Sequence, residues 1–261
     1  MATWIRFTYS NQQKFGVISN NIVSVHEGDM FGQHQPTGEE LELDQVTVET
    51  PCTPEKILAL WNNFYATAEK TGLPQPEHPW YFVKTPNTYA AANTQINRPA
   101  GCEGKLLFEG ELGIVIGKAC RGVGPKEVED YIFGYTCVND VTALAYLFKE
   151  DSFAHWTRAK CFDGFGIFGP AISTDIDPSN LTIKTFLEGN GEIQERQNYP
   201  VSDMIYSPYE IVSALSHDMT LKPGDIIACG TSVGAGAMKD GWTVRIDIDG
   251  VGTLTNTYSD S

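Results

Sequence analysis

The chain has 261 residues, of which 41% are hydrophobic and 20% charged, as in ordinary globular domains. This length is enough for one large domain, or for one domain with a small appendage. The formal net charge is −15, so the surface repels nucleic acid and anionic lipid, and we expect neither as a partner. A small anionic substrate stays compatible with this charge, because a local site can be positive on an acidic protein.

The sequence shows no targeting or membrane signal. Its first residues lack a basic segment followed by an apolar run, and no apolar stretch approaches the roughly 18 residues that a membrane span needs. The six cysteines form no CxxC pair, which favours buried free thiols in a reducing compartment. We therefore expect a cytoplasmic protein that does not bind a membrane.

Short strands are expected over most of the first 50 residues. Apolar and polar residues alternate between Asn and Gly turns, which predicts antiparallel strands over residues 4–9, 14–19 and 21–28. The polar segment 29–44 is rich in turn-forming residues and is expected to be a loop. A buried strand over 56–60 and one or two helical turns over 64–70 follow. The proline-rich segment after them is typical of a lid or binding loop.

Strands dominate the remainder of the chain. Helical patterns are fewer and cover residues 124–132, 141–151 and 207–218. This excess of strands, without alternation of strand and helix, predicts a mostly β or α+β architecture with short helices at its edges. The predicted strands cover residues 104–117, 131–140, 165–173, 181–189, 225–231 and 242–258.

Three acidic residues stand at the ends of strands that should be buried. Glu109 and Glu111 open the strand of FEGELGIVIG, and they share a face about 6.6 Å apart at Cα, because residues i and i+2 of a strand point the same way. Asp140 ends the strand of YTCVND. Carboxylates are seldom buried without a cation. Three of them suit a hard ion such as Mg²⁺, Mn²⁺ or Ca²⁺ and leave coordination positions for substrate and water.

Two further segments offer groups that recognise an anion. Lys160, in WTRAKCFDGFGIFGP, either faces an anionic substrate or is a surface lysine on a strand. Thr231 and Ser232 follow the strand of DIIACG at a glycine-rich turn. Their hydroxyls and the free backbone N–H groups suit a carboxylate, and the alternative is an ordinary turn. The turn lacks the lysine and spacing of a P-loop, so nucleotide binding is not expected.

Taken together, these motifs resemble those of the fumarylacetoacetate hydrolase superfamily, from about Lys56 to Tyr258. The resemblance implies a rolled, mixed β-sheet core with short peripheral helices, in a homodimer. It also implies a small N-terminal β domain over residues 1–50 and a catalytic domain over 51–261. The segments that carry it are FEGELGIVIGK, DYIFGYTCVNDVTA, WTRAKCFDGFGIFGP, SDMIYSPYEIVSALSHDMTLKPGDIIACGTSVG and GVGTLTNTY.

The resemblance implies roles for individual residues. One divalent ion per chain, Mg²⁺ or Mn²⁺, would be held by Glu109, Glu111 and Asp140. The catalytic lysine of the family corresponds to Lys160. Family substrates are small anionic 2-oxo and β-diketo acids, which are hydrolysed at a C–C bond, decarboxylated or tautomerised. The residues expected to bind substrate are Thr231, Ser232, Asn62 and Lys84.

The sequence departs from the family pattern in two places. Many members carry an Arg-Asp pair where this chain has Leu144-Ala145, so a long dianionic substrate bound in the usual way is in doubt. Hydrolytic members often carry a lid histidine as general base, and Thr67 stands at that position. Glu69, His78 and His155 are the candidates to replace this base.

Three interpretations follow. The first is a metal-dependent hydrolase of a C–C bond in a small acylpyruvate, with a decarboxylase or tautomerase of a 2-oxo acid as its variant within the family. The second is a binding module that holds a metal and an oxo acid without turnover. The third is a set of structural ion pairs, for which the cations nearest in sequence are Lys105, Lys118 and Arg121.

Overall fold

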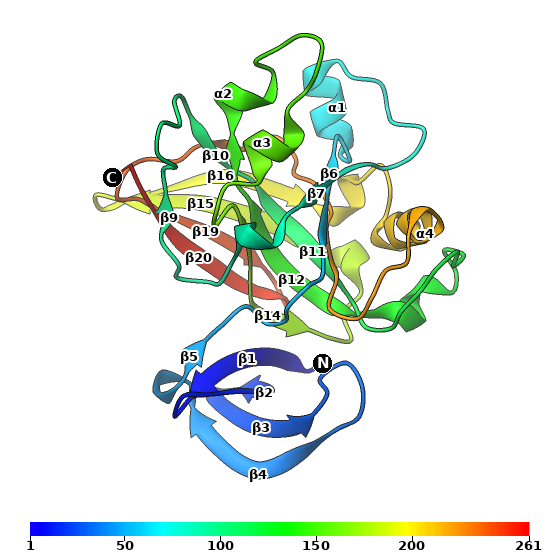
Figure 1. The fold of residues 1–261 in the computed structure, drawn as a ribbon, viewed down its shortest axis with the longest axis vertical. Helices are drawn as coiled ribbons and strands as arrows, with labels where there is room; N and C mark the ends of the chain where they lie inside the picture. The colour runs from blue at the N-terminus through cyan, green and yellow to red at the C-terminus, as the bar shows by residue number, and fades with distance from the viewer. Residues whose placement is uncertain (261) are drawn as a thin grey trace.

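The computed structural model describes residues 1–260 and is mostly β, as the sequence predicts (Figure 1). One large sheet runs through the molecule, and it is mixed because β17 pairs with β6, and β14 with β8, in parallel. Two short strands branch from it: β5 (Thr47–Val48) pairs with β1, and β8 (Tyr89–Ala90) pairs with β14. The main path runs β4 (His34–Glu42), β3 (Ile22–Gly28), β2 (Gln12–Ser19), β1 (Thr3–Tyr9), β14 (Gly166–Ser173), β12 (Ile132–Asp140), β11 (Gly110–Ile116), β17 (Ile226–Ala228), β6 (Ile57–Trp61) and β7 (Trp80–Lys84).

Two smaller sheets complete the β structure. The five-stranded sheet packs on β11, β12 and β14 of the large one, and the three-stranded sheet brings β10 next to the start of β11. The five strands are, in spatial order, β16 (Glu192–Pro200), β15 (Thr182–Gly189), β19 (Thr243–Ile248), β20 (Gly252–Ser259) and β9 (Ile96–Asn97), and the three are β13 (Thr142–Ala143), β10 (Leu106–Phe108) and β18 (Gly236–Ala237).

The central strand β11 is buried on both faces, and this explains its continuous apolar sequence. Leu112 and Ile114 point into the main core between the sheets. Val115 points to the opposite side, into a second core with Ile57 and Ile226. A strand in this position is held rigidly, so side chains at its beginning have well-defined positions.

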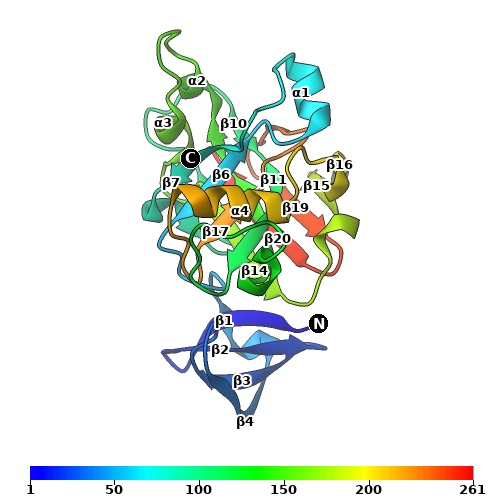
Figure 2. The same cartoon turned by 90° about the vertical axis from the view of Figure 1, so that its right-hand side faces the viewer.

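Strands β1–β4 form the end of the molecule drawn in blue (Figures 1 and 2). They join the rest of the large sheet where β1 pairs with β14, through Thr3 opposite Ser173 and Trp4 opposite Ile172. The division of the chain after residue 50 stays a prediction. The expectation of a loop over residues 29–44 is wrong, because β4 pairs with β3 as an antiparallel ladder. Pairing with a neighbouring strand outweighs the polar composition of this segment.

Three short helices lie at the opposite end of the molecule from β1–β4 (Figures 1 and 2). They are α1 (Tyr65–Thr71), α2 (Leu144–Leu147) and α3 (Trp156–Lys160). The fourth, α4 (Pro208–Asp218), begins as its sequence predicts, with a capping box between Ser207 and Glu210. The remaining helical turns are the 3₁₀ segments η1 (Leu43–Gln45), η2 (Pro86–Thr88), η3 (Val128–Tyr131), η4 (Pro178–Asn180) and η5 (Val201–Asp203).

Three expectations about local structure need correction, and one strand was missed. The helical pattern over 124–132 yields only η3, and the one over 141–151 yields β13 followed by the single turn α2. Lys160 ends helix α3 and is not on a strand. Strand β16 was not predicted, because its charged residues hide the inward-facing alternation.

Within residues 1–260, no helix is both long and apolar enough to cross a membrane.

Candidate metal and substrate site

The register between β11 and β12 brings the three predicted carboxylates together. Gly110 lies opposite Asn139 in this pair, and the backbone N–H of Asp140 donates to the carbonyl oxygen of Glu109 at 3.0 Å. Carboxylate oxygens of Glu109, Glu111 and Asp140 lie within 4.8 Å of one another, and all three residues are buried. Residues that lie 31 and 29 positions before Asp140 in the sequence therefore form one compact acidic cluster with it.

Gly110, between the two glutamates, is required by its neighbours. A Cβ atom at this position would lie 2.1 Å from the hydroxyl oxygen of Thr185. Its backbone N–H donates to Gln197 Oε1 at 3.1 Å, and its carbonyl oxygen accepts from Thr231 Oγ1 at 3.0 Å. The backbone between the two glutamates is thus held by Gln197 on β16 and by Thr231 in the turn after β17.

Replacing Gly110 with alanine should destabilise the protein by about 1–3 kcal/mol, because the new methyl group overpacks a rigid site. Urea unfolding followed by circular dichroism measures this change. Gly124→Ala is the matched control, since the nearest atom to its Cβ is a glutamate oxygen at 3.4 Å. Equal stability of the two variants would contradict the role of Gly110.

Two buried lysines neutralise part of the acidic cluster. Lys160 Nζ lies 2.8 Å from Glu109 Oε2 and 2.6 Å from Asp140 Oδ2. Lys84 Nζ lies 2.5 Å from Asp140 Oδ1 and donates to the carbonyl oxygen of Lys160 at 2.7 Å. The ion-pair interpretation from sequence therefore named the wrong cations, because Lys105, Lys118 and Arg121 are exposed.

The charges of the cluster do not balance, since three carboxylates face two ammonium groups. Burial raises the pKa of Glu111 well above its usual value, and the nearby Asp140 and Glu109 raise it further. Burial would also raise the pKa of Asp140, but the ammonium groups of Lys160 and Lys84 hold it below its usual value. Burial would lower the pKa of Lys160, but Asp140, Glu109 and Glu111 keep it above its usual value. Glu111 is the carboxyl group left without a cation.

The cluster fits a hard divalent ion. One oxygen of Glu111, Oε2, accepts from the backbone N–H of Gly230 at 2.8 Å, whereas the buried Oε1 has no hydrogen-bond partner. A buried carboxylate oxygen without a partner is costly unless a cation binds it. The donors are all carboxylate oxygens, which suits Mg²⁺ or Mn²⁺ better than zinc. Glu109, Glu111 and Asp140 would hold the ion.

The glycine-rich turn after β17 forms a second wall of the site. Thr231 Oγ1 donates to the carbonyl oxygen of Gly110 and accepts from Gln197 Nε2 at 2.8 Å, so its proton is already committed. Ser232 Oγ is buried and has no hydrogen-bond partner among residues 1–260, which leaves it available to bind a substrate. Sequence reasoning missed Gln197. The signal that could have found it is its inward-facing position on the alternating strand β16.

A cavity of about 190 Å³ opens next to the acidic cluster. Glu109, Lys160 and Ser232 lie at its inner end, and helices α1, α2 and α3 form its outer walls. The side of α1 that faces the cavity carries Thr67, Lys70 and Thr71, which lie on one face because they are three and four residues apart.

The remaining predicted site residues lie elsewhere. Glu69 is exposed and outside the cavity lining, because it lies on the far side of α1 from Thr67. His78 is also exposed and outside the lining. Asn62 is buried before α1, where its amide donates to the carbonyl oxygen of Pro74 at 3.0 Å. Lys84 is buried behind Asp140 and does not line the cavity.

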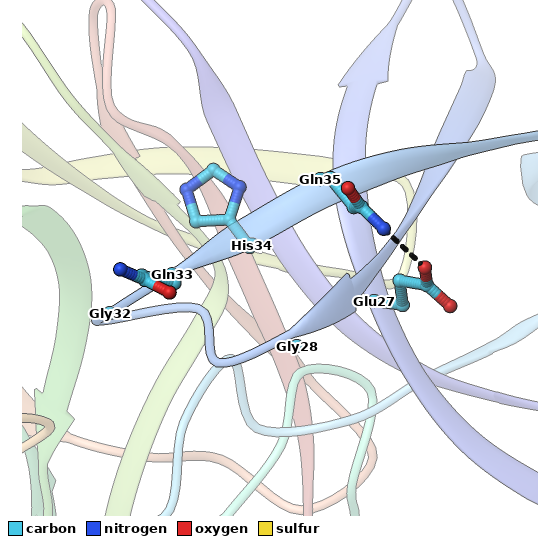
Figure 3. Close-up of a pocket in the computed structure, with 6 residues that line it drawn as sticks. All are labelled: Glu27, Gly28, Gly32, Gln33, His34 and Gln35. Atoms are coloured by element: carbon cyan, nitrogen blue, oxygen red, sulfur yellow. Dashed lines mark hydrogen bonds between the residues drawn. The ribbon is translucent and has the colours of Figure 1, made fainter.

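A larger hollow, of about 660 Å³, lies at the other end of the molecule, at the turn that joins β3 and β4. Figure 3 shows its lining, where the side chain of Gln35 donates to Glu27 at 2.7 Å. Glu27 is the one acidic residue in that lining. We therefore place the candidate site at the smaller cavity, because Glu109 and Lys160 of the acidic cluster line it. The larger volume of the other hollow does not outweigh this.

Comparison with protein families gives two matches along the chain. Residues 56–259 match the family model "Fumarylacetoacetate (FAA) hydrolase C-terminal". Residues 3–51 match the model "Rv2993c-like, N-terminal".

A curated relative is the 4-hydroxyphenylacetate degradation bifunctional isomerase/decarboxylase of Salmonella dublin, 38% identical over 203 residues. The match covers 77% of this chain and 46% of that protein, so this chain corresponds to about half of it.

Two solved structures have a similar fold. One is the 2-hydroxyhepta-2,4-diene-1,7-dioate isomerase of Mycobacterium marinum, with 34% identity and a TM-score of 0.89 over 100% of this chain and 99% of that one. The other is the maleylpyruvate hydrolase of Sphingobium sp. SYK-6 in complex with manganese(II) and pyruvate. It is 26% identical, with a TM-score of 0.79, and the match covers both chains completely.

Proposed function

Because this chain belongs to the fumarylacetoacetate hydrolase family and is an enzyme of that family, we propose that it isomerises a small unsaturated 2-oxo acid between its enol and keto forms. The reaction would use one divalent ion, Mg²⁺ or Mn²⁺, held by Glu109, Glu111 and Asp140. The observation that carries this proposal is the composition of the cavity wall. Groups that stabilise negative charge line the inner end, while no histidine lines the cavity among residues 1–260.

The side chains at the inner end suit the charge changes of this reaction. When bound, the divalent ion supplies a Lewis acid that polarises the 2-oxo group. Lys160 stays protonated beside Glu109 and Asp140, so its ammonium group can stabilise the negative charge that develops on the substrate oxygen. Ser232 Oγ, which has no partner within the protein, can donate to the substrate carboxylate and orient it.

The side chains of helix α1 that face the cavity suit isomerisation better than hydrolysis. An enol-to-keto conversion moves one proton from the enol oxygen to a carbon, with no other change in the atoms of the substrate. Hydrolysis additionally needs a base that activates water. The face of α1 towards the cavity offers Thr67, Lys70 and Thr71, none of which accepts a proton readily near neutral pH.

Hydrolysis of a C–C bond in an acylpyruvate is the second candidate. The likeness to the maleylpyruvate hydrolase that binds manganese(II) and pyruvate supports it. In that case Glu109, which among residues 1–260 is the carboxylate that lines the cavity, would have to exchange a partner for water, because Oε1 accepts from the Thr142 hydroxyl and Oε2 pairs with Lys160.

A substrate panel distinguishes these reactions. Purified protein with Mg²⁺ or Mn²⁺ should be given 2-hydroxyhexa-2,4-dienoate, 2,4-dioxopentanoate and oxaloacetate, with pyruvate, CO₂ and the keto tautomer measured separately by NMR. We expect faster formation of the keto tautomer than with the metal alone, without pyruvate or CO₂. Pyruvate together with acetate from 2,4-dioxopentanoate would select hydrolysis, and CO₂ from oxaloacetate would select decarboxylation.

Thr67→His tests the role of the lid directly. The imidazole would lie at the cavity wall, where it can take a proton from water near neutral pH. We expect pyruvate release from 2,4-dioxopentanoate to rise about 10²-fold or more, the usual contribution of a positioned general base. Thr67→Val is the control and should show no such gain. If the histidine variant releases no more pyruvate than the valine variant, the lid base is not what limits hydrolysis.

A further inference from the structure

The two ends of the cavity differ in chemistry. The inner end carries the polar groups of Glu109, Lys160 and Ser232. The outer end is bounded by large apolar side chains that are unusually exposed: Leu144 is 41%, Phe148 63% and Val233 38% accessible to solvent. Exposed apolar residues gathered around one opening mark a surface that a ligand covers.

Few cations are available at the outer end to hold a second anionic group. Lys160 lines the cavity, but its ammonium group is bound to Glu109 and Asp140. No arginine lines the cavity among the described residues 1–260, and Lys70 on the exposed side of α1 is the other lysine there. A carboxylate placed against Leu144, Phe148 and Val233 would meet apolar surface and no cation among these three side chains, so this end favours an apolar group.

We propose that the substrate has one carboxylate, at its 2-oxo end, and a short apolar tail that packs against Leu144, Phe148 and Val233. This inference rests on the proposed function, because it takes the inner end as the site of the 2-oxo acid. The cavity of about 190 Å³ is smaller than the roughly 300–1,000 Å³ of typical ligand pockets, so the tail has few carbons. The substrate class therefore differs from the dioate in the name of the M. marinum relative.

The test compares two acids of equal chain length, 2-oxohexanoate and 2-oxohexanedioate, by calorimetric titration in saturating Mg²⁺. We expect the monocarboxylate to bind at least about tenfold more tightly, because its terminal methyl group gains from contact with the apolar wall, whereas the second carboxylate of the dioate would lie there without a partner. Leu144→Arg should reduce or reverse this preference, and so should Phe148→Arg. Ile193→Arg is the matched control, because Ile193 is 69% exposed on β16, outside the cavity lining. It should leave the preference unchanged.

Titration with pyruvate distinguishes a failure of the proposed 2-oxo acid site from a failure of the apolar-tail inference. If pyruvate does not bind in Mg²⁺, the proposed 2-oxo acid site itself is wrong. If pyruvate binds but 2-oxohexanedioate binds as tightly as 2-oxohexanoate or more tightly, the apolar-tail inference is overturned. Loss of that dicarboxylate affinity in Lys70→Ala would then assign the distal carboxylate to the lid lysine.

Discussion

Asp140→Asn will lose both metal binding and turnover, and it will be less stable than the parent protein. Asp140 is the carboxylate that both buried lysines contact, one on each oxygen. The asparagine keeps the shape of the side chain but supplies no charge for the ion, so we expect the affinity for Mn²⁺ to fall by at least about 10²-fold. Turnover should fall by roughly 10²–10³-fold or more, as when an electrostatic contact to the transition state is removed.

The loss of stability in this variant has a separate cause. Lys84 and Lys160 are each 2% exposed or less. Without Asp140, Lys84 has no carboxylate partner among residues 1–260. Breaking a buried ion pair from one side costs about 3–5 kcal/mol. Urea unfolding measures this term in metal-free protein, and calorimetric titration with Mn²⁺ measures the binding term.

Asp225→Asn is the matched control for Asp140→Asn. Asp225 is equally buried and pairs with Lys56 at 2.5 Å, but it lies outside the cavity lining. Its replacement should destabilise the protein and leave the affinity for Mn²⁺ unchanged. If both variants bind Mn²⁺ like the parent protein, the acidic cluster is not the metal site.

The acidic cluster could be predicted from sequence because its signal is local. Acidic residues at the ends of apolar strands are unusual wherever they occur, and a period of two places Glu109 and Glu111 on one face without knowledge of the fold. Asp140 stands out in the same way at the end of its own apolar strand, and the family resemblance implies that it and Lys160 belong to the same site. The mostly β architecture followed from the excess of strand patterns in the same way.

The supporting residues could not be predicted because their roles depend on pairing between distant strands. Lys84 is expected from the sequence to bind substrate, yet β7 places it next to Asp140, fully buried and outside the cavity lining. Gln197 and Gly110 meet only because β16 lies close to the beginning of β11. Strand β4 forms through its ladder with β3 despite its polar composition.

Lys160→Met should separate charge balance from catalysis. The methionine fills a similar volume but leaves Glu109 and Asp140 without the ammonium group that contacts both. In metal-free protein we expect a loss of about 3–5 kcal/mol in unfolding free energy, because three buried carboxylates then face Lys84 alone. Mn²⁺ should restore much of it, since a ligand at 100 times its Kd stabilises the folded state by about 2.7 kcal/mol. Turnover should stay roughly 10²–10³-fold below that of the parent protein even with Mn²⁺ bound.

Lys84→Met provides the contrast that makes this result specific. Lys84 contacts Asp140 from behind and does not line the cavity, so its loss should lower stability and disturb the position of Asp140 without removing a group that faces the substrate. We therefore expect Lys84→Met to retain more turnover than Lys160→Met at saturating Mn²⁺, although both are destabilised. Unfolding curves with and without Mn²⁺, together with kcat at saturating metal, measure both effects. If Lys160→Met keeps the parental kcat, the lysine only balances charge, and the stabilisation of a developing oxyanion must come from other groups in the site.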